Sequence, residues 1–437
     1  MTALGIIGIL VAFALLIILI MKGVNIYLIA FICTIVVALS GQINLYDAFK
    51  THYMTGFTNF LKSNFLIFLT GTMLGKAMDV TGAARGIAKL VVKAVGVEMA
   101  FISVPLACGI LCYGGVSAFV CAFAVFPIAL QVFRAADLPR SYIPGALCFG
   151  CSTFAMVAPG APQIHNTIPA STLGTEIMAG AVSGFIACGA MLVIGMFWLF
   201  LMLRKETAKG AHFVAKEMDV FGEEDDRTPN GLLALIPLII CVGLINIKID
   251  GQTIAPVEVG VLAGSILTVI MFHNFIEMKA VPGYFAEACK TSITAITNTC
   301  AVVGFGTVVS NSAAFTPIID SLMRIPGPEL LGLGIGTTVI AGICGSASGG
   351  LGIASPLLGT AYVAQGLAPA VVHRVMSISS SALDSLPHNG YIVTVTNGLC
   401  NETHKDSYMP TFKLTVIVPF IGTLIAVALF TIFPNLP

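Results

Sequence analysis

The chain carries little charge for its length. Asp, Glu, Lys and Arg make up 10% of its 437 residues, against about 25% in soluble proteins. Acidic and basic residues balance to a formal net charge of zero, so there is no excess of basic residues to attract nucleic acid. With a hydrophobic content of 57% and a mean hydropathy of +0.98, the composition excludes an ordinary soluble domain and indicates a protein of the lipid bilayer.

The sequence also lacks the segments of alternating polarity that form membrane barrels. Apolar runs that approach the about 20 residues of a spanning helix recur instead. The clearest of them are Ala3–Met21, Val24–Ser40, Ala179–Leu203, Leu232–Asn246, Val257–Phe272 and Leu414–Phe433. The first run has no basic residues before it and no small-residue cleavage site, so we expect a spanning helix there rather than a cleavable signal peptide.

Metal and redox motifs are absent as well. The chain has 12 cysteines, but no CxxC pair is accompanied by histidines at metal-binding spacing. Cys148 and Cys151 form a CxxC inside an apolar run, and we interpret both as small buried hydrophobic residues. The sequence therefore predicts no metal site and no cofactor.

A single long polar stretch, Arg204–Asn230, divides the chain. It predicts a first half (1–203), a linker (204–230) whose charges form a solvated face, and a second half (231–437). Each half shows three apolar spans, a short amphipathic helix, an apolar hairpin with a small-residue tip, a broken span and a final span. The amphipathic helices and the hairpins are predicted at Gly82–Val95 and Glu98–Phe133, and at Pro317–Arg324 and Glu329–Gln365.

The number of crossings predicts how the halves are oriented. A hairpin enters and leaves on one face, so each half makes five full crossings, and an odd number inverts the second half. Most of the 21 Lys and Arg residues fall on one side if the linker is cytoplasmic and both termini lie outside. We therefore predict an all-α polytopic membrane protein with two inverted repeats, each with five spanning helices, one of them broken, and a re-entrant helical hairpin.

Pro and Gly interrupt one span in each half. The breaks read Ala158–Asn166 and Asp384–Gly390, and a basic residue, Arg140 or Arg374, opens each broken span. Backbone groups freed by such a break cannot stay unpaired in lipid, so the break is tolerated where protein buries it or where it lines a wet cavity. Two breaks at matching points are typical of a transporter's substrate site.

The tips and breaks predict an anion site built without basic residues. No Lys or Arg lies between Met99 and Phe133 or between Ser141 and Leu203, whereas helix N-termini offer free N–H groups. The candidate binding residues are Gly114, Gly115, Ser117, Pro159, Gly160, His165, Asn166, Ser346, Ser348, Gly349, Gly350, His388 and Asn389. Each has a structural alternative: helix packing for the glycines, back-bonding for the serines, capping for the asparagines and a neutral buried ring for the histidines.

Asp384 is the candidate proton carrier, with His388 as its partner or substitute. It is the one acid between Glu329 and Glu402, and an intramembrane carboxylate is costly and marks function by default. The alternatives are a helix cap or an ion pair with Arg374.

These motifs resemble those of the gluconate permease (GntP) family, within a superfamily of elevator carriers with two hairpins. The resemblance covers most of the chain and is carried by Pro159–Pro162 with Leu173-Gly174, Gly345–Ser348 with Gly352–Pro356, and Ser385–Gly390 with Lys405–Tyr408 and Thr411–Lys413. It implies a multi-pass inner-membrane secondary transporter of a small organic anion, coupled to protons or, as the other candidate, sodium. It also implies an elevator motion and a homodimer.

Departures from the family pattern bear on the substrate. His165 is displaced from the prolines of the first break, and Pro387-His388-Asn389 stands where sugar-acid carriers have an Asn-Asp pair. The surroundings include Val157, Ala158, Ala161 and Leu386. Because a polyol needs many hydroxyl partners, this composition favours a short hydroxy- or keto-monocarboxylate such as 3-hydroxybutyrate over gluconate.

Two other functions compete with a proton symporter. A cation/proton antiporter would bind its cation at Asp384, but no second intramembrane acid lies near that break. An intramembrane hydrolase would need a nucleophilic serine with a base and an oxyanion hole, and no GxSxG motif is present. We therefore predict a transporter and not an enzyme.

Overall fold

The computed structural model describes residues 2–97, 99–113, 118–161, 163–217, 219, 228–249, 252–322 and 328–434. Over these residues the chain is helical apart from a short hairpin of β1 (Lys248–Ile249) and β2 (Gln252–Thr253). Helices long and apolar enough to cross a bilayer lie at Ala3–Met21, Ala118–Ala135, Ala181–Ala208, Met278–Ser310 and His404–Ile432.

The first half begins with its apolar spans and ends with a long helix. Its elements are α1 (Thr2–Met21), α2 (Ile26–Ser40), α3 (Leu45–Asp47), the π-helical η1 (Ala48–Tyr53), α4 (Met54–Val80), the amphipathic α5 (Ala83–Val95), η2 (Ala100–Ile102), α6 (Ser103–Tyr113), α7 (Ala118–Ala135), η3 (Arg140–Tyr142), α8 (Ile143–Cys148), the π-helical η4 (Phe149–Ala155), α9 (Ile164–Leu173) and α10 (Ala181–Ala208).

The second half follows the same order. Its elements are α11 (Gly231–Ala234), α12 (Ile236–Asn246), α13 (Val257–Met271), η5 (His273–Phe275), η6 (Met278–Ala280), α14 (Val281–Ser310), α15 (Phe315–Leu322), α16 (Glu329–Cys344), α17 (Ala347–Ala354), η7 (Ser355–Gly359), α18 (Thr360–Ala364), α19 (Pro369–Ser379), η8 (Leu383–Ser385), α20 (Gly390–Val393), η9 (Thr394–Leu399), α21 (His404–Phe412), η10 (Lys413–Ile417) and α22 (Val418–Ile432).

Local chemistry explains several of the helix ends. The side chains of Asn25 and Asn230 accept from backbone N–H groups in the first turn of α2 and α11. Gly174 and Gly345 end α9 and α16 with φ of +65° and +58°, a left-handed conformation that suits glycine. The predicted amphipathic helices are present as α5 and α15, although Arg324 lies outside the described residues.

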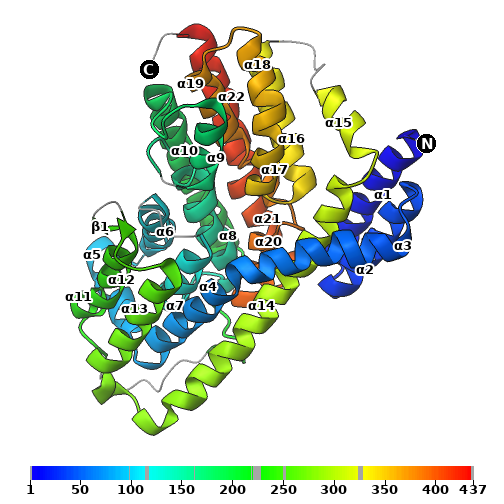
Figure 1. The fold of residues 1–437 in the computed structure, drawn as a ribbon. Helices are drawn as coiled ribbons and strands as arrows, with labels where there is room; N and C mark the ends of the chain where they lie inside the picture. The colour runs from blue at the N-terminus through cyan, green and yellow to red at the C-terminus, as the bar shows by residue number, and fades with distance from the viewer. Residues whose placement is uncertain are drawn as a thin grey trace.

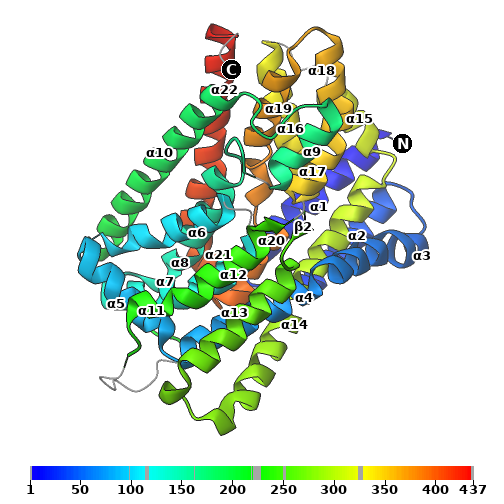
Figure 2. The same ribbon diagram turned by 60° about the vertical axis from the view of Figure 1, so that its left-hand side comes forward.

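The helices form two packed groups (Figure 1). The long-helix layer comprises α1–α4 and α11–α14, with α4 and α14 running side by side along most of their length. The bundle comprises α6–α10 and α16–α22, in which α10 packs on α22 and α16 on α19. Seen from a second direction, α9 lies next to α17, so the end of one broken span meets the hairpin of the other half (Figure 2).

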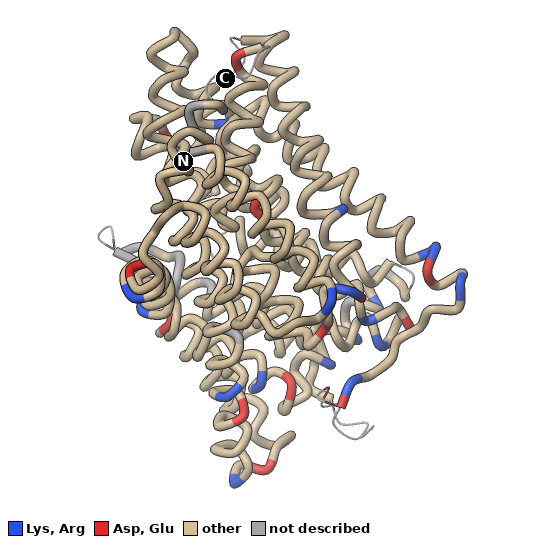
Figure 3. Tube along the Cα trace, turned by 90° about the vertical axis from the view of Figure 1, so that its right-hand side faces the viewer, with Lys and Arg blue, Asp and Glu red and all other residues tan. Residues whose placement is uncertain are grey.

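The surface fits a bilayer. Large apolar side chains are exposed on several helices, among them Ile110 at 73%, Val193 at 67% and Ile239 at 65%. Lys, Arg, Asp and Glu gather towards one end of the molecule, whereas both termini lie in the other half of the view (Figure 3). Most charged residues lie at that end because burying a charge in hydrocarbon is costly.

Candidate functional site

The first break lies between η4 and α9. Gly160 takes a φ of +82°, and its N–H donates to the Ile177 carbonyl at 3.0 Å. A Cβ atom at Gly160 would lie 2.8 Å from the Met178 sulfur, so a side chain there would strain both the backbone and the packing. The Pro159 carbonyl accepts from the Tyr113 hydroxyl at 3.2 Å, which attaches the end of α6 to the break.

Asn166 and Arg374 hold this break together. The Asn166 amide donates to the carbonyls of Met156, Ala158 and Ala161 at 2.9–3.3 Å. Its oxygen accepts from Nη1 of Arg374 at 2.7 Å. Both side chains are fully buried, so Asn166 satisfies the backbone that the break frees, which is the capping role that the sequence left open.

The guanidinium of Arg374 makes its other contacts with backbone carbonyls of the first half. It donates to Val157 at 2.7 Å and to Ile177 and Ala179 at 2.9 Å. Within the described residues it has no carboxylate at ion-pair distance, so the ion pair with Asp384 that the sequence offered as an alternative is not formed. A buried positive charge therefore faces the first break with carbonyl dipoles alone around it.

His165 lies one residue before Asn166 and is 3% exposed. Its backbone carbonyl accepts from the Ser377 hydroxyl at 2.7 Å, yet neither ring nitrogen has a hydrogen-bond partner among the described residues. A buried ring with two unpaired nitrogens is unusual, because each lost partner costs about 1–3 kcal/mol. This side chain therefore remains free to contact a ligand at the N-terminus of α9.

Asp384 in the second break touches the hairpin of its own half. Its carboxylate accepts from the Ser385 hydroxyl at 2.9 Å and lies near the backbone N–H groups of Ser385 and Ala347. Ala347 is the first residue of α17, so the carboxylate lies at a helix N-terminus. The Tyr408 hydroxyl donates to the Ser385 carbonyl at 3.0 Å and fixes the break from the side of α21.

His388 and Asn389 bind the same hairpin tip at the end of α16. Nε2 of His388 donates to the Gly342 carbonyl at 2.9 Å, and the Asn389 amide donates to the Gly345 carbonyl at 3.1 Å. The Asn389 oxygen also accepts from the Ile392 N–H and caps α20. Nδ1 of His388 has no partner, and its ring packs on Phe13 of α1 with centroids 5.1 Å apart.

The serines and glycines of the second hairpin tip have mainly structural contacts. Ser346 caps α17 through the Gly349 N–H, and its hydroxyl lies 2.9 Å from that of Ser348. Gly349 is exposed, whereas a Cβ atom at Gly350 would lie 2.5 Å from Cα of Ala341, so Gly350 serves close helix packing. The predicted residues of the first tip, Gly114, Gly115 and Ser117, lie outside the described residues.

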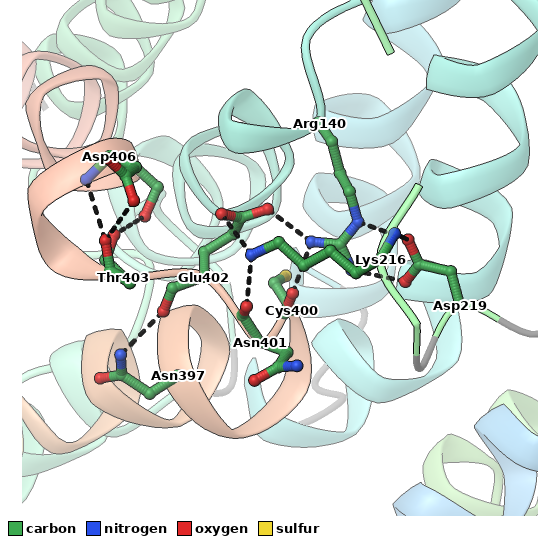
Figure 4. Close-up of polar contacts among 10 residues, drawn as sticks. Arg140, Lys216, Asp219, Asn397, Cys400, Asn401, Glu402, Thr403 and Asp406 are labelled. Carbon is green, nitrogen blue, oxygen red and sulfur yellow. Dashed lines mark hydrogen bonds and ion pairs between the residues drawn. The ribbon is translucent and has the colours of Figure 1, made fainter. Parts of the chain in front are cut away.

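Arg140 and the linker form a second buried polar cluster (Figure 4). Nε and Nη2 of Arg140 donate to the Asp219 carboxylate at 2.7 and 2.6 Å, and Nη1 donates to Glu402 and to the Cys400 carbonyl. Lys216 pairs with Glu402 at 2.7 Å. The prediction that the linker charges form a solvated face is wrong for Lys216 and Asp219, because the carboxylate of Asp219 is needed to neutralise a buried arginine.

The electrostatics of this cluster keep Arg140 charged. Burial by itself lowers the pKa of the Arg140 guanidinium. Hydrogen bonds and the negative charge of Asp219, with those of Glu402, more than offset burial, and the pKa is raised above its usual value.

A cavity of about 560 Å³ opens between the long-helix layer and the bundle. Its walls come from α4, α7, α14 and the segment around η9, and they include the ion pair of Lys76 with Glu287 at 2.8 Å. None of the described residues predicted for the substrate site lines it. Arg140 and Asp219 do, so the linker cluster faces this cavity.

Sequence reasoning missed the contacts that join distant segments. The sequence placed Arg374 at the start of a span and as a possible ion-pair partner of Asp384, and it assigned Lys216 and Asp219 to solvent. The available signal was the matched position of Arg140 and Arg374, since two arginines in corresponding places of apolar segments need buried partners.

Comparisons with known proteins identify similar sequences over most of the chain. The model of the GntP family permease matches residues 4–281. An uncharacterized transporter of Bacillus subtilis, YxjC, is 32% identical over 91% of this chain and 92% of its own length. An uncharacterized transporter of Haemophilus influenzae is 22% identical over 78% of each chain.

Two solved structures align over most of the chain at low similarity. The YdaH transporter of Alcanivorax borkumensis covers 89% of this chain and 88% of its own, with 16% identity and a TM-score of 0.37. MtrF of Neisseria gonorrhoeae, described as one of a class of antimetabolite efflux pumps, covers 91% and 85%, with 15% identity and a TM-score of 0.40.

Proposed function

Because the chain belongs to the GntP family of permeases, we propose that it is a proton-coupled symporter of a small organic anion. Membership in this family makes it a multi-pass membrane transporter and not an enzyme. The proposed substrate is a short hydroxy- or keto-monocarboxylate such as 3-hydroxybutyrate, with gluconate as the longer candidate. Protons are the proposed coupling ion, with sodium as the other candidate.

The position of Asp384 carries this proposal. Its carboxylate lies near the backbone N–H of Ala347 at the start of α17, where the helix dipole and the N–H groups of the first turn favour an anion. The protein thus already holds a carboxylate at the hairpin, and a substrate carboxylate would make the same kind of contact. Protonation of Asp384 would remove that negative charge and leave the N–H groups and the Ser346 and Ser348 hydroxyls to the substrate. Proton and anion would then bind together, as symport requires.

The charged and unpaired polar groups at the first break also favour the binding of an anion. Arg374 contributes a buried positive charge that no described carboxylate balances. His165 precedes Asn166, the partner of Arg374, on α9, and neither of its ring nitrogens has a hydrogen-bond partner among the described residues. A cation/proton antiporter is less well supported, because the described neighbours of Asp384 are hydrogen-bond donors rather than the oxygen ligands that a cation needs.

The arrangement in the membrane belongs to the same proposal. The helices of residues 1–203 and 231–437 follow one order, which supports two inverted repeats with the linker between them. The charge-rich end in Figure 3 supports a cytoplasmic linker and external termini in the inner membrane. The cavity between the long-helix layer and the bundle supports an elevator mechanism in which the bundle moves against that layer. A homodimer formed through the long-helix layer would keep that layer fixed.

Uptake into proteoliposomes tests the function. Labelled 3-hydroxybutyrate and gluconate would be offered with an inward proton gradient and no sodium, and we expect accumulation of the shorter acid. Accumulation that requires sodium would make sodium, rather than the proton, the coupling ion. No accumulation under either condition would contradict symport.

Asp384→Asn tests the coupling, with Asp47→Asn at an exposed site of the long-helix layer as the matched control. Because the asparagine cannot carry a charge, this variant should exchange substrate across the membrane but should not accumulate it. Accumulation by Asp384→Asn that still follows the pH gradient would remove Asp384 from the mechanism. The double variant Ser348→Ala/Asn389→Ala tests the binding site, and unchanged affinity there would mean that the site lies elsewhere.

A further inference from the structure

Five cysteines gather where the first hairpin packs against the first broken span. Cys108 and Cys112 lie on α6, Cys121 on α7, Cys148 at the end of α8 and Cys151 in η4. All five are fully buried and none is in a disulfide. Nearly half of the chain's 12 cysteines therefore lie in one apolar region, although they come from different helices.

Three of these thiols are close enough to share one ion. The sulfur atoms of Cys112, Cys121 and Cys151 lie within 4.8 Å of one another, and those of Cys112 and Cys121 are 3.3 Å apart. A zinc–sulfur bond of about 2.3 Å in tetrahedral geometry places its sulfur ligands about 3.8 Å apart. The 3.3 Å separation of Cys112 and Cys121 and the 4.8 Å upper limit for all three pairs are within reach of that value, and small rotamer adjustments would centre the three sulfurs on one ion.

Local features around the cluster also point to a ligand. The Tyr391 hydroxyl is buried without a geometrically defined hydrogen-bond partner and lies beside Cys151. Such a donor is costly to leave unpaired, and a metal-bound thiolate would accept from it. Cys151 lies in the π-helical η4, a type of turn that is frequent at functional sites. Gly150 permits the close approach of α6, since a Cβ atom there would lie 2.6 Å from Cβ of Cys108.

We propose that Cys112, Cys121 and Cys151 bind one thiophilic d¹⁰ metal ion, Zn²⁺ or Cu⁺, beside the substrate path. Zn²⁺ would bind as three thiols lose three protons, and Cu⁺ as two of the three lose two protons, with the remaining thiol as a neutral ligand. Each product carries one net negative charge, which the Tyr391 hydroxyl is placed to stabilise. The ion would be structural and would join both arms of the first hairpin to the broken span.

The proposal is independent of the transported substrate, and metal analysis tests it directly. The full-length protein would be purified under reducing conditions from cells grown with added Zn²⁺ or added Cu⁺, and its metal content measured. We expect one ion per chain from one of these media and a higher thermal unfolding temperature than after removal of the metal with a chelator. The medium that gives full loading identifies the ion.

Matched serine variants locate the site. Cys121→Ser and Cys151→Ser should lose the ion, whereas Cys188→Ser, at a buried cysteine of α10 outside the cluster, should keep it. If the cluster variants do not fold, Co²⁺ added to the wild-type protein gives a readout without mutation, because thiolate ligands produce an intense charge-transfer band. Wild-type protein that binds neither Zn²⁺, Cu⁺ nor Co²⁺ overturns the proposal. A Cys112–Cys121 disulfide found by mass spectrometry of the metal-free protein would replace it with a redox pair.

Discussion

Arg140 and Arg374 occupy matching points of the two halves, and each reaches into the other half, but their partners differ in kind. Arg140, in η3, contacts Glu402 and the Cys400 carbonyl beyond the second broken span, together with Asp219 of the linker. Arg374, in α19, contacts carbonyls of the first half and the neutral amide of Asn166. One arginine is balanced by carboxylates, and the other by backbone carbonyls and one neutral side-chain amide.

The difference shows two ways of stabilising a buried guanidinium. At the charge-rich end the linker supplies carboxylates, and Lys216 balances the second of them, so the cluster is close to neutral. Within the first break no carboxylate is at hand, and the carbonyls that the break frees become the acceptors. The carbonyls around a break that would be costly in lipid thereby stabilise a buried positive charge.

Removing Arg374 should have the largest effect. Arg374→Met would leave the carbonyls of Val157, Ile177 and Ala179 and the Asn166 oxygen without their donor. At about 1–3 kcal/mol for each buried group, we expect a loss of at least about 4 kcal/mol. Thermal unfolding in detergent measures it, with Lys50→Met at an exposed site as the control. A variant as stable as the control would mean that water replaces the guanidinium.

Removing Arg140 should cost somewhat less and depend on pH. Arg140→Met would leave Asp219 and Glu402 buried with Lys216 as their remaining cation, at a cost of about 3–5 kcal/mol. Protonation would neutralise the excess negative charge that the missing guanidinium leaves behind. The folded variant should therefore take up more protons than the unfolded chain as pH falls, and its stability should recover in acid. Arg374→Met has no carboxylate to protonate and should not recover. Unfolding temperatures at several pH values compare the two variants. If Arg374→Met regained as much stability in acid as Arg140→Met, carboxylates would not be what distinguishes the two arginines.

Replacing the neutral partner of Arg374 should have an intermediate effect. Asn166→Leu would leave the carbonyls of Met156, Ala158 and Ala161 without a donor, and we expect a loss of at least about 3 kcal/mol. Unfolding in detergent, with Asn274→Leu at an exposed position as the control, gives the difference. No difference between the two variants would show that the break is closed without Asn166.

Lys216 should matter least. Its side chain is 33% exposed, so Lys216→Met should change stability by no more than about 1 kcal/mol, and added salt should reduce the effect further. Titration of unfolding temperature with salt, for wild type and variant, measures this. A loss as large as that of Arg140→Met would mean that Lys216, rather than Arg140, neutralises Glu402.

Local patterns in the sequence predicted the elements but not their partners. Apolar runs located α1, α2, α10 and α13 within a few residues, and Pro and Gly located both breaks. The π-helical turns η4, η7 and η9 were not predicted, because one extra residue in a turn is decided by packing rather than by composition. The candidate site was predicted at the level of residues such as Asp384 and Asn389, whereas their hydrogen bonds to the hairpin were not.

The sequence by itself determined that this chain is a helical membrane protein of a permease family, and it located the two breaks. Hydrophobicity and helix-breaking residues act over a few turns, so the linear order of residues contains that information. Only the tertiary structure decided that Arg374 closes the first break, that Asp219 of the linker neutralises Arg140 and that Cys112, Cys121 and Cys151 converge. Those contacts join residues far apart in the chain, and they form because a buried charge or polar group must find a partner wherever packing brings one within reach.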